Sequence, residues 1–278
     1  MFAAAFAPPT FEFGDYVPAL AALAAAAALV LFLLHRALLS KIQPPPATVG
    51  RPWWRKALAG AAWAAALLAA SLAIPAAAGS FAPTAGDFRP FSYPQAPAGL
   101  PNVGRVAALF LVQSLWEELI FRGLAMGILG LLLALLLGKA GLERQRAWAT
   151  AGLVANALQA VLFALLHHGN PAATPLSLLN IFLAGVLLGA LFWSQGALWG
   201  AWAFHFVWNF GLAAVGLPVS GVTATPALLP LGIRGAREDL LSGGRFGPEG
   251  SILATVALAI AAAALLRGSR PRGAPPAG

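Results

Sequence analysis

The sequence predicts an all-α fold, a polytopic transmembrane helical bundle of about seven to eight helices. Hydrophobic residues make up 60% of the 278-residue chain and charged residues only 9%, whereas about a quarter of the residues of a soluble domain are charged. Several apolar runs exceed the ~18 residues that cross a bilayer. None of them alternates between apolar and polar residues as barrel strands do, so the spans are expected to be helices.

The chain is expected to form one membrane-embedded domain over residues 1–278, because no polar stretch is long enough to fold alone. The formal net charge is +8. We attribute it to loop Lys and Arg residues, which orient membrane proteins, and not to nucleic-acid binding. The absence of cysteine excludes disulfides, thiolate metal sites and a cysteine nucleophile.

The apolar runs predict the elements in order along the chain. The expected spans cover residues 17–39, 57–78, 103–137, 148–168, 176–193, 197–215 and 251–266. Prolines spread through residues 79–101 predict an irregular loop there, because proline cannot continue a helix. The block 103–137 is too long for one straight crossing, and Arg122 and Gly123 mark a predicted kink or break. Residues 267–278 are rich in Pro, Gly and Arg and are expected to be a disordered tail.

The distribution of Lys and Arg predicts the orientation in the membrane. A single crossing by block 103–137 places eleven of these residues on one side and five on the other, whereas two crossings give eight on each. Cytoplasmic loops carry the excess of positive residues. The sequence therefore favours seven crossings, with the N-terminus outside and the C-terminus in the cytoplasm.

Glu117 and Glu118 lie inside this apolar block, with Arg122 one turn further on. An ionisable side chain in the hydrocarbon region costs about 2.5–3.5 kcal/mol, so such groups are usually functional and face a protein interior. The i, i+4 spacing places Glu118 to pair with Arg122. Glu117 then has no cation of its own, which suits a general base. The alternative is that both glutamates bind Arg122 in a structural network.

Two further polar groups interrupt apolar helices downstream. His167 ends an expected helix four residues after Phe163, and His205 and Asn209 share one helix face at i, i+4 spacing. A Glu and a His that converge on one water can generate a nucleophile, which favours Glu117 and His167 as partners. His205 and Asn209 can both donate hydrogen bonds to an oxyanion, and the alternative for this pair is an interhelical polar clamp.

A metal site is a further alternative. Glu117, His167 and His205 form a His/His/carboxylate set of the kind that binds zinc. The chain has no HExxH motif, and the two histidines come from different helices, so a water polarised without a metal is the preferred interpretation. A proton-relaying transporter would also bury Glu and His, but no inverted repeat relates the two halves of this sequence.

Three motifs appear in order on separate expected helices: EExxxR (Glu117, Glu118, Arg122), FxxxH (Phe163, His167) and HxxxN (His205, Asn209). Together they resemble the signature motifs of the CPBP family, which includes type II CAAX prenyl endopeptidases and bacteriocin-processing or immunity proteins. The run from 180 to 210 also resembles that family between its second and third motifs. The resemblance covers about residues 100–215.

This resemblance implies an intramembrane endopeptidase that hydrolyses a peptide bond of a membrane-associated protein or peptide. It assigns water activation to Glu117 and His167 and the oxyanion hole to His205 and Asn209. It assigns structural support to Glu118, Arg122 and Phe163. The alternative is a non-proteolytic membrane immunity or scaffold protein with the same fold. The expected partners are the lipid bilayer and the peptide substrate, and the expected location is the inner (cell) membrane.

Overall fold

The computed structural model describes residues 51–83, 100–222, 231–234 and 239–268. The expected span 17–39 and most of the expected tail lie outside these residues. In chain order the elements are α2 (Trp53–Ala77), β1 (Phe81–Pro83), α3 (Leu100–Glu118), the π-helix η3 (Leu119–Met126), α4 (Gly127–Lys139), α5 (Arg144–Leu166), α6 (Pro175–Gln195), α7 (Trp199–Ala214), β2 (Leu231–Ile233), the 3₁₀ turns η4 (Gly244–Phe246) and η5 (Pro248–Gly250), and α8 (Ile252–Gly268).

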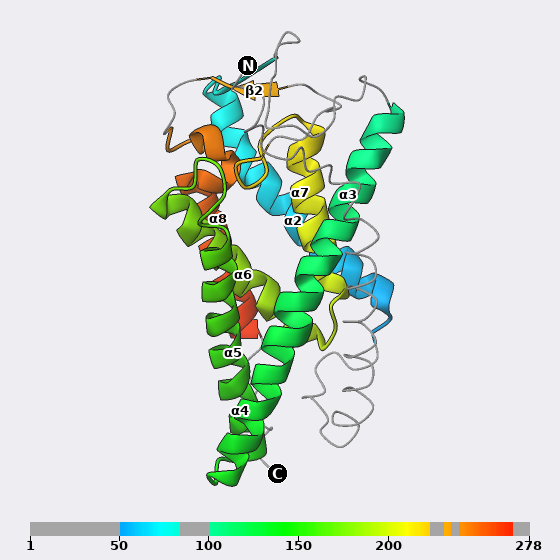
Figure 1. Ribbon diagram of the computed structural model, residues 1–278, viewed down its shortest axis with the longest axis vertical. Helices are drawn as coiled ribbons and strands as arrows, with labels where there is room; N and C mark the ends of the chain where they lie inside the picture. Colours follow the sequence, from blue (N-terminus) through cyan, green and yellow to red (C-terminus); the bar gives the residue numbers. More distant parts are fainter. Residues whose placement is uncertain (1–50, 84–99, 223–230, 235–238, 269–278) are drawn as a thin grey trace, which may run out of the picture.

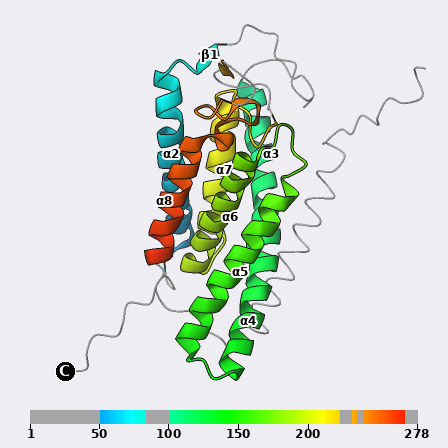
Figure 2. The same ribbon diagram turned by 90° about the vertical axis from the view of Figure 1, so that its left-hand side faces the viewer.

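The fold is the all-α membrane bundle that the composition predicts (Figure 1). Within the described residues, four helices are long and apolar enough to cross a membrane, and α8 contains a shorter apolar helix. The expected number of seven to eight helices is not established by these residues. Figure 2 shows α2, α8, α6 and α5 as neighbouring rods, and α7 packs against α2 and α3. The largest buried cluster joins side chains of α2, α6, α7 and α8.

The expected kink or break at Arg122 and Gly123 is replaced by a π-helical segment in an unbroken helix. The helix from Val106 to Lys139 contains 34 residues, with η3 between α3 and α4. A π-helical turn accommodates an extra residue while the backbone stays hydrogen-bonded, so the helix changes its facing direction without ending. At 1.5 Å per residue this helix is about 50 Å long, well beyond the ~30 Å hydrocarbon core. It therefore tilts within the bilayer or extends past it.

Small residues bring the helix backbones close together around the buried core. A Cβ added to Gly60 of α2 would lie 1.9 Å from the carbonyl oxygen of Gly200 in α7. A Cβ on Gly189 of α6 would lie 2.0 Å from Oδ1 of Asn156 in α5. A Cβ at either position would clash with the neighbouring helix, so these contacts require glycine. Such close packing is favourable because van der Waals attraction between helices replaces the hydrophobic effect inside a membrane.

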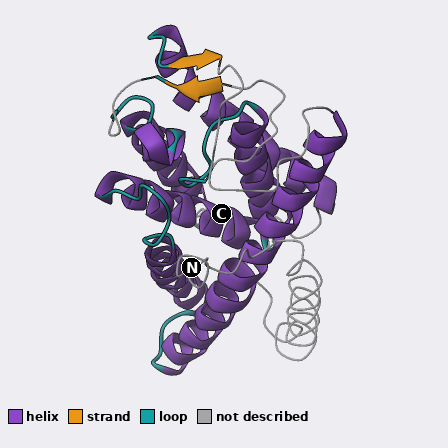
Figure 3. Cartoon of the chain, turned by 45° about the horizontal axis from the view of Figure 1, so that its top comes forward, coloured by secondary structure: helices purple, strands orange, loops and turns teal. Residues whose placement is uncertain are grey.

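The loop regions contain a small sheet that the sequence analysis did not predict. Within the expected irregular loop, Phe81–Pro83 forms β1, which pairs antiparallel with β2 (Figure 3). The two strands lie at one end of the bundle. Each has three residues, which is too short for an alternating pattern to be recognised in the sequence.

Candidate active site

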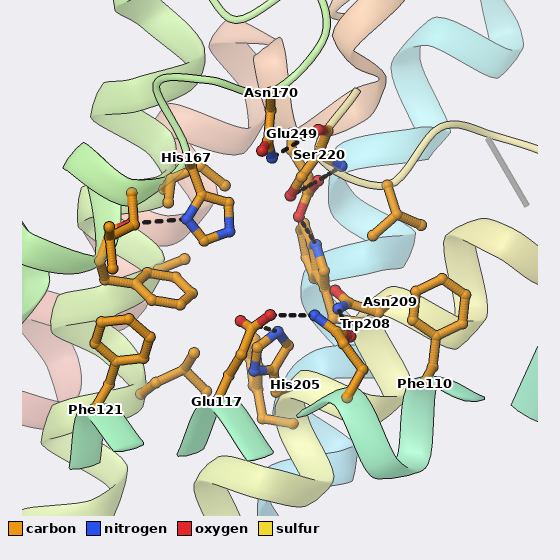
Figure 4. Close-up of a pocket in the computed structure, with 18 of the residues that line it drawn as sticks. Phe110, Glu117, Phe121, His167, Asn170, His205, Trp208, Asn209, Ser220 and Glu249 are labelled. Atoms are coloured by element: carbon orange, nitrogen blue, oxygen red, sulfur yellow. Dashed lines mark hydrogen bonds and ion pairs between the residues drawn. The ribbon is translucent and has the colours of Figure 1, made fainter. Parts of the chain in front are cut away.

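The three motifs meet at one cavity of about 490 Å³ between α3, α5, α6 and α7 (Figure 4). Glu117 comes from the end of α3, His167 from the C-terminal end of α5, and His205 and Asn209 from one face of α7. All four of these predicted catalytic residues line the cavity. The structure therefore gathers side chains that lie up to 92 positions apart in the sequence.

Glu118 and Arg122 form an ion pair inside the helix bundle. The Arg122 Nη1 lies 2.7 Å from Oε1 of Glu118, and both side chains are 0% exposed. Nδ1 of His205 lies 2.8 Å from the same carboxylate oxygen. Since a carboxylate paired with Arg122 only accepts hydrogen bonds, Nδ1 of His205 is the donor. Glu118 therefore bonds both to Arg122 of its own motif and to His205 of the third motif. The i, i+4 spacing places Arg122 within reach of Glu118.

Glu117 is the carboxylate that faces the cavity. Its Oε1 accepts a hydrogen bond from Nε2 of Gln113, one turn earlier in α3. Its Oε2 lies 3.7 Å from Nε2 of His205 and has no hydrogen-bond partner among the described residues. The Nδ2 of Asn209 donates to Oε1 of Gln113 at 3.2 Å, so Gln113 connects α7 to Glu117. Gln113 was not among the predicted site residues.

His167 is positioned by the end of its own helix. Its Nδ1 lies 2.7 Å from the carbonyl oxygen of Phe163, which can only accept a hydrogen bond. Nδ1 therefore carries the proton, and a neutral imidazole presents an unprotonated Nε2. Figure 4 shows the rest of the ring turned toward the cavity, on the wall opposite Glu117. This arrangement suits a residue that accepts a hydrogen bond from a water.

The ring of Phe163 lies beside residues from all three motifs. The guanidinium carbon of Arg122 lies 4.6 Å from its centroid, and the His167 and His205 rings lie 4.5 and 6.2 Å away. Phe163 is buried and also packs edge-on against Phe121. A cation over an aromatic face is attracted to the ring quadrupole, so Phe163 stabilises Arg122 as well as packing against both histidines.

The loop before α8 adds a carboxylate that the sequence analysis missed. Glu249 lies in η5, is buried, and lines the same cavity. Its carboxylate accepts hydrogen bonds from Trp208 and Ser220. In the sequence, Glu249 lies in a Gly-rich loop that precedes a span and also contains Glu238 and Asp239. No local signal therefore distinguished it.

The alternative zinc ligands, Glu117, His167 and His205, all line the cavity. Within the described part of the chain, no group of three or more His, Asp or Glu side chains is placed to hold a metal ion. Nδ1 of His167 bonds to a backbone carbonyl and Nδ1 of His205 bonds to Glu118, so each imidazole could reach a metal only through Nε2. Oε1 of Glu117 is hydrogen-bonded to Gln113, and its Oε2 has no hydrogen-bond partner among the described residues.

The comparison with protein families identifies the region that builds this cavity. Residues 99–211 match the family model described as type II CAAX prenyl endopeptidase Rce1-like. The chain carries an Rce1-like region. This confirms the resemblance predicted from the three motifs, all of which lie inside the match. No curated protein and no solved structure matches the chain.

The Rce1-like region and the membrane-length helices together support a protease-type enzyme that is a multi-pass membrane protein. The match begins next to α3 and ends within α7. It therefore includes Glu117, His167, His205 and Asn209, while Ser220 and Glu249 of the cavity wall lie beyond it.

Proposed function

We propose that the protein is an intramembrane endopeptidase in which Glu117 and His167 activate a water for attack on a peptide bond. The observation that carries this proposal is the convergence of the three motifs on one cavity between apolar helices. Oε2 of Glu117 and Nε2 of His167 are both free of hydrogen bonds to the described residues and face the same space. A water between them would be oriented by two acceptors, which is the arrangement that general-base catalysis needs.

The reaction follows from this arrangement. The water oxygen attacks the carbonyl carbon of the substrate as its proton passes to Glu117. A tetrahedral intermediate forms, and its oxygen carries a negative charge. The bond from carbon to nitrogen then breaks, and Glu117 returns the proton to the leaving amine. The products are a new carboxyl end and a new amino end, and Glu117 is regenerated.

The oxyanion would be stabilised by Asn209 and His205. The Nδ2 of Asn209 has two N–H groups, and only one is used by Gln113. His205 already donates Nδ1–H to Glu118, so it can donate to the oxyanion only through Nε2. That donation requires an imidazolium, which would lie between the carboxylates of Glu118 and Glu117.

The test is cleavage of a panel of membrane-associated peptides by the purified protein and by Glu117→Gln. The exposed Glu143 provides a matched control, since Glu143→Gln also neutralises one carboxylate, at the residue just before α5. We expect the control to cleave at the normal rate and Glu117→Gln to lose at least ~100-fold in kcat, a typical general-base contribution. Equal cleavage by wild type and Glu117→Gln would refute the assignment of Glu117. The non-proteolytic alternative predicts no cleavage and full biological function in Glu117→Gln.

A chelator in the same assay tests the role of metal. Retained activity with chelator is expected for a water activated by Glu117 and His167 alone. Chelator-sensitive activity that zinc restores would replace this mechanism with a metal-dependent one.

We further propose that the chain lies in the inner (cell) membrane with its C-terminus in the cytoplasm. The excess of Lys and Arg on that side supports this orientation. Because the chain has no cysteine, single cysteines introduced in the 140–143 loop and in the 239–243 loop can be labelled separately from each side. Labelling of the first loop from outside the cell would contradict the proposal.

A further inference from the structure

Glu249 is a buried carboxylate in the cavity, outside the region that matches the family. Its side chain lines the cavity wall and the residue is only 7% exposed. Oε1 accepts a hydrogen bond from Nε1 of Trp208 at 2.9 Å. Oε2 accepts from the backbone N–H and from the hydroxyl of Ser220. All three donors are neutral, so these hydrogen bonds bring no positive charge to the carboxylate.

Among the residues that the structure describes, the charges around the cavity leave Glu249 without a counter-ion. Glu118 is neutralised by Arg122, and Glu117 faces His205. Among the described residues, no Lys, Arg or His lies within ion-pair distance of Glu249, and no Lys or Arg lines the cavity. A buried charge that lacks a partner is costly, and a cation that enters the cavity would remove that cost.

A second set of hydrogen bonds holds the backbone of Glu249. Nδ2 of Asn180 donates to the carbonyl oxygens of Glu249 and Ser251 at 2.7 and 2.8 Å. Oγ1 of Thr255 in α8 donates to Oδ1 of the same Asn180 at 2.7 Å. These bonds fix the backbone of Glu249 between α6 and α8. A fixed acceptor loses little entropy when a ligand binds, so the site is preorganised.

Aromatic rings complete the surroundings of this carboxylate. The Trp208 indole, whose N–H is bound by Glu249, stacks on Phe204 with centroids 6.0 Å apart and planes at 10°. Both rings line the cavity. A carboxylate beside aromatic rings is suited to ammonium and guanidinium groups, because the rings attract cations through their quadrupoles.

We propose that Glu249 is a substrate-recognition residue that binds a cationic group of the peptide, either a Lys or Arg side chain or a free amino group. This inference rests on the proposed function, because it names the substrate class of the same cavity. Peptides with a basic residue near the cleaved bond are therefore the favoured substrates.

The test measures peptide binding, so that it does not depend on cleavage. Membrane-associated peptides that differ only by Lys, Gln or Glu at one position, scanned along the sequence, are titrated against Glu117→Gln protein in nanodiscs. At one or more positions we expect the Lys peptide to bind roughly tenfold more tightly than the Gln peptide, and the Glu peptide more weakly than both. Adding Glu249→Gln should remove the preference for Lys and leave binding of the Gln peptide within about twofold.

Ser220→Ala is the matched control for a purely structural role of Glu249. It removes one hydrogen bond to the carboxylate and keeps the charge. We expect Ser220→Ala to retain the preference for Lys. If no position shows a preference for Lys, or if Glu249→Gln and Ser220→Ala weaken all peptides equally, Glu249 is a structural residue and the inference is wrong. Failure of the proposed function is a separate result, namely peptide binding without cleavage by the wild type.

Discussion

Replacing Arg122 by methionine tests whether the first motif is held together by its buried ion pair. Arg122→Met leaves the carboxylate of Glu118 fully buried with only His205 as a partner. Removal of one member of a buried pair costs about 3–5 kcal/mol, because the remaining charge is not compensated. The variant also loses the guanidinium that lies 4.6 Å from the Phe163 centroid. For a chain of this size, 1 kcal/mol lowers Tm by roughly 2–4 °C, so the expected loss is about 6–20 °C.

The assay is thermal unfolding of the purified protein in detergent micelles, followed by the intrinsic fluorescence of its tryptophans. Arg146→Met is the matched control, because Arg146 also pairs with a glutamate, but at 3.7 Å and with both side chains largely exposed. It is expected to leave Tm within about 1 °C of the wild type, as for most surface pairs.

The double variant Glu118→Gln/Arg122→Met separates charge from packing. It removes both charges and keeps a side-chain oxygen that can accept the hydrogen bond from His205. Neutral replacement of a whole buried pair is often tolerated, so most of the lost Tm should return. A single variant that melts within about 2 °C of the wild type would refute the uncompensated-charge argument, and a double variant as unstable as the single one would assign the loss to packing.

Two further substitutions test the site and the helix packing. Gln113→Leu should lower kcat by roughly tenfold to 100-fold with little change in Tm, because Glu117 and Asn209 both lose the carboxamide that orients them. Cleavage kinetics measure the first effect and a melting curve measures the second. Gly60→Ala should cost about 1–3 kcal/mol in stability, because the added methyl group clashes with α7. Gly138 has open space around it, so Gly138→Ala should leave Tm unchanged or raise it. Melting curves in detergent compare the two variants.

Most of the helical architecture is predictable from hydropathy alone. Expected spans at 57–78, 148–168, 176–193, 197–215 and 251–266 correspond to α2, α5, α6, α7 and α8, with ends that differ by a few residues. Apolar length is a strong signal because a bilayer demands a fixed thickness of apolar helix. The ends differ because capping and proline geometry decide them locally. Thr174 and Pro175, for example, start α6 with a capping box.

The π-helical segment shows where the sequence pattern is insufficient. Gly123 suggested a weak point in the helix, but whether a helix breaks there or accommodates an extra residue depends on its tertiary contacts. In the structure, Arg122 is completely buried against Glu118 and Phe163, and these contacts keep the segment helical. A break would expose the guanidinium to lipid. The contact with Phe163 of α5 is a tertiary one, and it cannot be seen in hydropathy.

The site was predictable to the extent that its residues follow helix periodicity or a family motif. The pairing of Glu118 with Arg122 follows from i, i+4 geometry, and the three motifs do line one cavity. Contacts between helices were not predictable in the same way. Gln113 bonds to Asn209 across 96 positions of sequence, and Trp208 bonds to Glu249 across 41. Such contacts depend on how each helix is rotated about its axis relative to its neighbour. The sequence pattern of one helix does not give that rotation.

The two parts of the cavity wall have different physical characters, and this difference bears on what the enzyme can select. On the motif side, Glu118 is neutralised by Arg122, and the two histidines and Phe163 hold one another in place. Glu249, beyond the motifs in the sequence, has no cationic partner among the described residues and is held by neutral donors. A wall whose charges are already paired has little freedom to rearrange around different substrates. It therefore suits a reaction that is the same for many peptides. Selection then falls to the side with an unmatched charge, so substitutions at Glu249 should change which peptides bind while substitutions at Glu117 should change whether they are cut.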